Sequence, residues 1–149
     1  MDMAGRRLKS IFKRVRGVVF LFLVACSLPA ANYVDTSDSP VNRPLILRSY
    51  VTNADLLLIG VEGYPPNDRL TFYRLVPPPG FAGREVMSNE ILPKGTGIQV
   101  LGARRCTNCG PSDDQLRIVL LERRLEQPVY LSKRYIRTLL THLNRDGDN

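Results

Sequence analysis

Short apolar runs, broken repeatedly by proline and glycine, are the feature that most constrains how this chain folds. The 149 residues include 11 Pro and 11 Gly, which interrupt regular structure. Runs rich in Leu, Ile, Val and Tyr that last only a few residues are typical of strands. We therefore expect a mainly β protein, with one mostly β domain at 45–144 that forms a small barrel or sandwich. The candidate strands are residues 45–51, 56–61, 70–76, 98–104, 116–122 and 129–131.

The connections between these runs carry their own signals. The polar residues 52–55 separate the first two runs, so the sequence predicts a hairpin there. Residues 77–83 contain three consecutive prolines and predict a stiff loop, with a polyproline segment offered to a partner as the alternative.

The end of the chain predicts a helix at residues 132–144, followed by a disordered tail at 145–149. Ser132 is a suitable N-cap. The apolar side chains of this segment recur at the helical spacing and form one stripe. They are Tyr135, Ile136, Leu139, Leu140 and Leu143.

The first 25 residues look like an export signal. They hold six of the 21 basic residues and one of the 14 acidic residues, so the formal charge of +7 falls to +2 (15 bases and 13 acids) without them. The basic character is thus weak evidence for nucleic-acid binding, and we expect none. The apolar run at 18–25 has the length of a signal-peptide core and is too short for a membrane-spanning helix.

The end of this run, Leu23-Val24-Ala25-Cys26, resembles the lipobox of bacterial lipoproteins. The resemblance implies that Cys26 receives acyl chains such as palmitate and that residues 1–25 are removed as a signal peptide. Ser27 takes the place of the Asp that retains such proteins in the inner membrane, which favours the outer membrane, facing the periplasm. An uncleaved signal anchor is the alternative. The composition of residues 26–44 predicts a lipid anchor followed by a flexible tether, with Pro29, Pro40 and Pro44.

A second, shorter resemblance covers residues 84–136. The phrase Leu92-Pro93-Lys94-Gly95-Thr96, followed by Val100-Leu101, is similar to a turn and strand of the bacterial Src-homology-type small β-barrel, and residues 130–136 are similar to its closing segment. The opening strand of that family does not match, and the chain has no Trp. The resemblance implies binding to cell-wall peptide or glycan. Such a module would need an open aromatic groove, for which the candidates are Tyr64, Phe72, Tyr73, Phe81 and Tyr130.

Cys106 and Cys109 form a Cys-x-x-Cys pair with three interpretations. An exported protein reaches an oxidising compartment, so we expect a disulfide. A zinc site needs four ligands, whereas the chain offers no second pair and its only histidine is His142. A redox thiol needs a helix N-terminus, but this pair follows a strand and precedes a turn. A zinc ribbon that binds nucleic acid would require a cytosolic protein.

No catalytic signature is present in the sequence. It lacks a nucleophile elbow and a phosphate loop. The neighbouring carboxylates of Asp113 and Asp114 point to opposite sides of an extended chain. We therefore expect no enzyme, no cofactor and no bound metal.

The charge of the mature chain leaves one further possibility open. Residues 94–149 hold ten basic and six acidic residues, a difference of +4. A basic face of this kind can meet anionic lipid headgroups, lipopolysaccharide or acidic wall polymers, although ordinary solubilising charge explains it too.

Together these features predict an exported, lipid-anchored envelope lipoprotein that acts as a non-catalytic interaction or assembly module in the periplasm. The expected partners are the membrane, through the anchor, and an envelope protein or the cell wall. A peptidoglycan-binding module and a thiol-disulfide protein that uses Cys106 and Cys109 are the alternatives.

Overall fold

A computed structural model describes residues 31–63, 68–109 and 114–143. The expected signal peptide, the lipidation site Cys26, the aromatic residue Tyr64 and the expected tail at 145–149 lie outside the described residues. The described elements, in chain order, are β1 (Tyr33–Asp35), the 3-10 helix η1 (Arg43–Leu45), β2 (Ser49–Thr52), β3 (Leu56–Glu62), β4 (Leu70–Val76), β5 (Val86–Leu92), β6 (Gly97–Cys106), β7 (Asp114–Leu120), β8 (Val129–Ser132), the 3-10 helix η2 (Lys133–Tyr135), the short helix α2 (Ile136–Leu139) and β9 (Leu140–His142).

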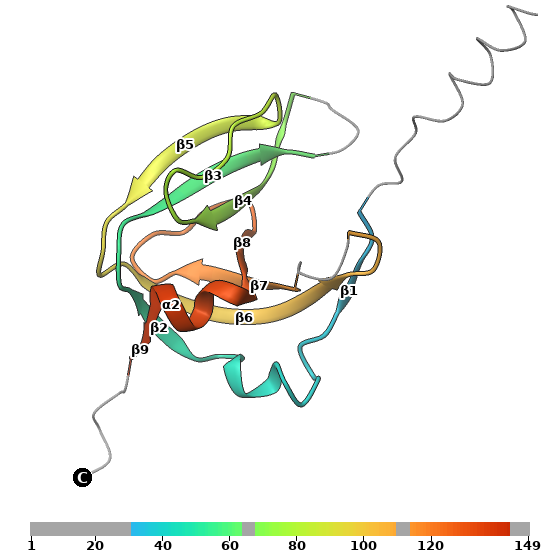
Figure 1. Ribbon diagram of the computed structural model, residues 1–149, viewed down its shortest axis with the longest axis vertical. Helices are drawn as coiled ribbons and strands as arrows, with labels where there is room; N and C mark the ends of the chain where they lie inside the picture. The colour runs from blue at the N-terminus through green and yellow to red at the C-terminus, as the bar shows by residue number, and fades with distance from the viewer. Residues whose placement is uncertain (1–30, 64–67, 110–113, 144–149) are drawn as a thin grey trace, which may run out of the picture. The chain divides into compact units, whose positions relative to one another are not determined.

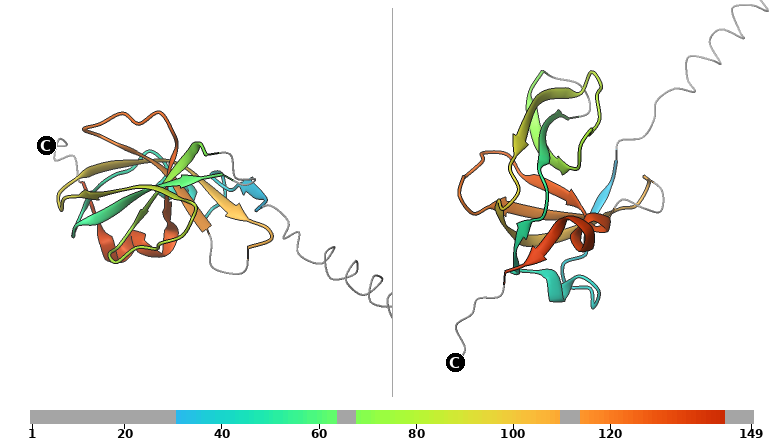
Figure 2. Two further views of the ribbon diagram at one scale, coloured as in Figure 1. Left: turned by 90° about the horizontal axis from the view of Figure 1, so that it is seen from above. Right: turned by 60° about the vertical axis from the view of Figure 1, so that its left-hand side comes forward.

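All nine described strands belong to one sheet, in the order β5-β3-β4-β8-β7-β6-β2-β9, with β1 added beside β6. The β4–β8 pair is parallel and the other pairs are antiparallel. The sheet curls strongly on itself into a half-barrel, as Figure 1 and Figure 2 show. The prediction of a mainly β protein with a C-terminal helix is confirmed.

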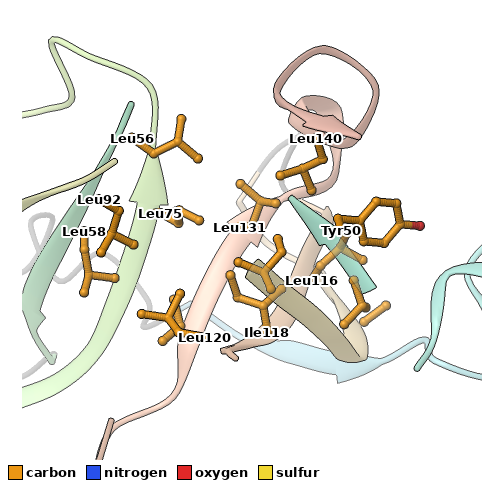
Figure 3. Packing of buried hydrophobic residues seen from close by; sticks show 14 residues of the cluster. Tyr50, Leu56, Leu58, Leu75, Leu92, Leu116, Ile118, Leu120, Leu131 and Leu140 are labelled. Carbon is orange, nitrogen blue, oxygen red and sulfur yellow. The ribbon is translucent and has the colours of Figure 1, made fainter. Parts of the chain in front are cut away.

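The main hydrophobic core lies on the inner face of the curled sheet (Figure 3). Strand alternation explains it: Leu116, Ile118 and Leu120 of β7 point inward and are at most 7% exposed. They meet Leu131 of the neighbouring strand β8 and Leu58 of β3, which lies further along the curled sheet. This packing leaves the alternate positions of the same strands on the outer face.

Strand β3 is buried on both faces. Leu57, Ile59 and Val61 form a second cluster on the face opposite the main core, with partly buried side chains that include Phe81. The loop at 77–83 contributes Phe81, and it turns at Gly80, which has a φ of +76° and lies so close to β3 that a Cβ would be 2.9 Å from Leu57. The proline-rich stretch is therefore a loop between strands, as predicted, and it covers part of the outer face.

The prediction of a tether at 26–44 was wrong for residues 31–44, which are folded. Strand β1 pairs with the end of β6, matching Tyr33 with Cys106. Asn42 is 2% exposed and donates a hydrogen bond to the carbonyl of Thr36 at 3.0 Å. The Nζ of Lys133, far along the chain, donates to the side-chain oxygen of Asn42. Polar composition was misleading here because these side chains satisfy one another and the backbone.

The predicted hairpin between residues 45–51 and 56–61 is also absent. β2 pairs with β6 and β9, whereas β3 pairs with β4 and β5. The chain therefore leaves one end of the sheet after β2 and joins the other end at β3. Local turn residues do not reveal such a crossing, because non-local partners decide the pairing.

The predicted helix at 132–144 is much shorter. Residues 133–139 form η2 and α2, and at Leu140 the backbone becomes extended and pairs with β2. The Ser132 side chain makes no capping hydrogen bond. Tyr135, Ile136, Leu139 and Leu140 pack in or against the main core, as the apolar stripe predicts. Leu143, the last member of the predicted stripe, is 37% exposed, so the stripe ends earlier than predicted.

Strand β5 had no counterpart among the predicted strands. Its residues 87–91 are exposed because β5 is an edge of the sheet, so its sequence lacks the apolar content of the others.

Within the described part of the chain, no helix has the length and apolar character required to cross a membrane.

Candidate binding face of arginine and aromatic side chains

The outer face of strands β4, β8, β7 and β6 gathers arginine and aromatic side chains. Strand register places Arg74 of β4 opposite Tyr130 of β8, and Tyr130 opposite Arg117 of β7. In a parallel row, Arg104 of β6 lies opposite Gln115 of β7. Residues that face each other across paired strands share one side of the sheet. We call the set Tyr33, Phe72, Arg74, Arg104, Gln115, Arg117 and Tyr130 the arginine–tyrosine face.

Arg104 is held at the centre of this face. Its guanidinium carbon lies 3.8 Å from the centroid of the Tyr33 ring and 3.4 Å from that of Tyr130. Stacking of a guanidinium on an aromatic face is favourable, by about 0.5–2 kcal/mol for each ring. Arg104 is thus fixed between two rings contributed by β1 and β8, strands that are far apart in the sequence.

Gln115 orients this arrangement from beneath. It is 2% exposed, and buried polar groups are stable only with hydrogen-bond partners. Its Oε1 accepts bonds from Nε and Nη2 of Arg104 at 3.0 and 2.7 Å, and its Nε2 donates to the Tyr33 hydroxyl at 3.3 Å. The buried glutamine therefore presets the positions of Arg104 and Tyr33.

The aromatic contacts continue towards β4. Tyr130 meets Phe72 edge to face, with centroids 5.9 Å apart, and the guanidinium of Arg74 lies 5.9 Å from the Phe72 centroid. Phe72 also packs against the second cluster on β3. The row of alternating cations and rings is therefore supported by that cluster.

A cavity of about 250 Å³ opens on this face between β4, β8 and η2. Arg74 and Tyr130 line one part of it, and Arg134 and Tyr135 of η2 line another. The Arg134 side chain donates to the Tyr135 hydroxyl at 2.6 Å. The other described lining residues are Leu75, Val76, Cys109, Gln115 and Ser132. Guanidinium and hydroxyl donors of this kind suit an anionic group.

Two carboxylates near this face already have partners. Asp35, beside Arg104 across the β1–β6 pair, accepts a hydrogen bond from the backbone N–H of Ser37 at 2.7 Å, and its pKa is lowered by bonds from Ser37. Asp114 accepts two bonds from Arg105 at 2.8 and 3.1 Å. Arg105 neutralises Asp114, whereas Asp35 keeps its negative charge beside Arg104, and the charge of Arg117 contributes to its lowered pKa. The three arginines of the face outnumber this one carboxylate, which does not line the cavity.

The aromatic residues predicted to form one groove are distributed differently. Phe72 and Tyr130 come together on the arginine–tyrosine face. Tyr73 packs against the main core, and Phe81 belongs to the second cluster. The sequence did not predict four residues of this face: Tyr33, Arg74, Arg104 and Gln115. The alternation of polar and apolar residues along β6 and β7 is a signal that could have indicated Arg104 and Gln115.

Cys106 and Cys109 are joined as a disulfide, with Cα atoms 5.5 Å apart. The turn they close holds the start of the fold, because the Thr107 N–H donates to the Asn32 carbonyl at 2.8 Å and the Asn32 N–H donates to the Asn108 side chain at 2.8 Å. Cys106 is 6% exposed and ends β6.

Within the described residues, no cluster of His, Cys, Asp and Glu side chains has the arrangement of a metal site.

Removing this disulfide is expected to cost a moderate amount of stability. The double variant Cys106→Ser with Cys109→Ser should lower the free energy of unfolding by about 2 kcal/mol, the chain-entropy value for so small a loop. Urea unfolding followed by circular dichroism measures it. As a control, reductant should bring the wild-type protein to the variant's midpoint and leave the variant unchanged. A reductant-insensitive midpoint would contradict the assignment.

The Arg105–Asp114 pair predicts a small acid sensitivity. Hydrogen bonds and the charge of Arg105 hold the pKa of Asp114 below its ordinary value of 3.8. A carboxyl whose folded-state pKa is depressed stabilises the fold above its unfolded-state pKa, and this stabilisation disappears as pH falls through the lower, folded-state value. The Asp114→Asn variant should therefore be less stable than wild type by less than about 1 kcal/mol at neutral pH, because the pair is partly exposed. Thermal midpoints should converge well below pH 4, whereas a constant difference across pH would assign the effect to packing.

A larger and more apolar hollow, of about 680 Å³, lies beside the β7–β8 connection. Its lining includes Leu101, Val119 and Leu125. Arg123 of this connection forms a bidentate ion pair with Glu90 of β5, at 2.7 and 2.9 Å, which fixes the connection to the sheet edge. Arg117 of the arginine–tyrosine face also lines this hollow, whereas the stacked residues of that face do not.

Comparison with known proteins adds no relative: no family model, curated protein or solved structure matches this chain.

Proposed function

We propose that the chain is an exported bacterial lipoprotein, anchored in the outer membrane through Cys26, whose domain is a non-enzymatic binding module facing the periplasm. The observation that carries the proposal is the order of three features: a basic segment, the apolar run at 18–25 and Cys26. The described fold then begins at Ala31, five residues after Cys26.

The arginine–tyrosine face supports a binding role. Arg104 is immobilised between Tyr33 and Tyr130, so little of its side-chain entropy remains to be lost when a ligand binds. The cavity beside it presents two further arginines, Arg74 and Arg134. Such preset donors recognise an anionic partner without any chemical step.

The disulfide is consistent with export. Disulfides persist in oxidising compartments such as the periplasm and are rare in the cytosol. Because Cys106 ends a strand and is nearly buried, its surroundings favour a structural crosslink over a reactive thiol, which needs exposure and a stabilised thiolate.

Cell-wall binding is the second candidate, favoured by the contact between Phe72 and Tyr130 on the outer face. Both rings are half-buried, and aromatic rings that are partly accessible beside hydrogen-bonding side chains are suited to sugar rings and peptides alike. Co-sedimentation of the protein with purified peptidoglycan would support it, and recovery in the soluble fraction would exclude it.

The primary test is the intact mass of the protein purified from the membrane fraction of its own host. The proposal expects a chain that begins at Cys26 and carries acyl chains, two hydrogens lighter than its reduced form because of the disulfide. A chain that begins at Met1 without acyl groups, recovered in the soluble fraction, would overturn the lipoprotein proposal.

A further inference from the structure

The described fold starts at the arginine–tyrosine face. Asn32 is fixed to the disulfide turn by hydrogen bonds in both directions. Tyr33, the next residue, stacks on Arg104. Figure 1 shows β1 running along the end of β6. Whatever precedes residue 31 is therefore covalently attached close to this face.

The distance from the proposed anchor to this face is limited by chain length. Tyr33 is seven positions after Cys26, and each residue step spans at most about 3.6 Å, so the two are no more than about 25 Å apart. If Cys26 carries acyl chains, as proposed above, its backbone lies at the membrane surface. The arginine–tyrosine face then stays within a short distance of the lipid headgroups.

The cavity on this face has the chemistry for a phosphate group. Arg74 and Arg134 line it together with the hydroxyl-bearing residues Ser132, Tyr130 and Tyr135. A guanidinium has several donors in a planar fork that matches phosphate oxygens, and hydroxyls donate to the remaining oxygens. The described lining residues contain no Asp or Glu, so an anion meets no carboxylate among them.

The cavity also has a fixed framework. Arg74 lies opposite Tyr130 in the β4–β8 pair, and the Phe72 ring contacts both the Tyr130 ring and the Arg74 guanidinium. On the other side, Arg134 stacks on Tyr135 with a guanidinium-to-centroid distance of 4.6 Å. Two stacked arginines on separate elements, η2 and β4, thus line one opening.

We propose that this cavity binds the phosphate of an anionic phosphoglyceride headgroup in the membrane that holds the anchor. The inference depends on the proposed function for the nearness of the membrane, and on the cavity for its chemistry. A second attachment of this kind matters because acyl chains and a basic patch together hold a protein at a membrane more firmly than either does alone. It would also fix the orientation of the domain on the membrane.

The test uses the protein purified from the membrane fraction of its own host and reconstituted in lipid nanodiscs. The acyl chains of Cys26 hold the processed chain in the disc, and the apolar run at 18–25 holds a chain that is not processed. The discs contain phosphatidylcholine, alone or with an increasing share of phosphatidylglycerol. Because the chain has no Trp, the fluorescence of its tyrosines can be followed directly, and two of them line the cavity. We expect a saturable change with phosphatidylglycerol and none with phosphatidylcholine alone.

The decisive variant is Arg74→Gln with Arg134→Gln. It should raise the share of phosphatidylglycerol needed for half the change by about tenfold or more, since each lost charge-assisted hydrogen bond costs at least that order of affinity. The matched control is Arg43→Gln with Arg84→Gln, which removes the same charge from exposed positions outside the cavity and should shift the midpoint less than twofold. Circular dichroism and the thermal midpoint verify that both variants fold.

Three outcomes would overturn the inference. Equal shifts in the two double variants would mean a non-specific charge effect. A response to inorganic phosphate with phosphatidylcholine discs, without a response to phosphatidylglycerol, would assign the cavity to a soluble phosphate. If the mass shows that Cys26 is acylated and the fluorescence does not respond to phosphatidylglycerol, headgroup binding is rejected and the lipoprotein proposal stands. If the mass shows no acyl chains on Cys26, the lipoprotein proposal is rejected separately.

Discussion

Replacing Cys26 with serine is expected to abolish both processing and lipid anchoring. The proposed acylation requires a thiol nucleophile, and a serine hydroxyl is far less nucleophilic at neutral pH. Without acylation the signal remains attached, so the intact mass should be that of the full chain, 16.8 kDa before the small change from sulfur to oxygen. The wild-type protein should instead begin at Cys26 and carry acyl chains. Mass spectrometry of membrane and soluble fractions measures both effects.

The control for this experiment is the double variant at Cys106 and Cys109. It removes the other two cysteines of the chain but should leave acylation of Cys26 unchanged, because the two sites are chemically independent. If the Cys26→Ser protein is still cleaved at the same bond, a conventional signal peptidase is responsible and the lipobox interpretation fails.

The fold class followed from the sequence because strand length and alternation are local properties. The run at 70–76 coincides with β4, and the run at 116–122 overlaps β7. The partners of each strand did not follow. Pairing of β2 with β6 and β9, rather than with β3, depends on contacts distant in sequence, and no local turn signal encodes them.

Most of the candidate site was hidden for the same reason. Tyr33 lies in a segment whose composition predicted a tether, yet it stacks on Arg104, which is 71 positions later. Gln115 lies on the outer face of β7, where the alternation of residues predicts an exposed side chain. It is only 2% exposed, because Arg104 and Tyr33 cover it and form hydrogen bonds with it. Only Phe72 and Tyr130 were anticipated, as aromatic residues in predicted strands.

The second large effect is expected at β3, where both faces of one strand are buried. Leu58 is 1% exposed in the main core and Ile59 is fully buried in the second cluster. Leu58→Ala and Ile59→Ala should each lower the free energy of unfolding by about 2–5 kcal/mol, through lost burial and the cavity left behind. Urea unfolding curves with unchanged slope give the values.

Ile91→Ala is the matched control, because Ile91 lies on the neighbouring edge strand β5 and is 66% exposed. Its cost should stay below about 1 kcal/mol, as for ordinary surface positions. An Ile59→Ala cost as small as that of Ile91→Ala would mean that the loop at 77–83 does not close the outer face in solution. The result bears on binding too, since Ile59 lies directly opposite Arg74 in the β3–β4 pair and Phe72 packs against the same cluster. Loss of that cluster would therefore remove the support on which the arginine–tyrosine face is built.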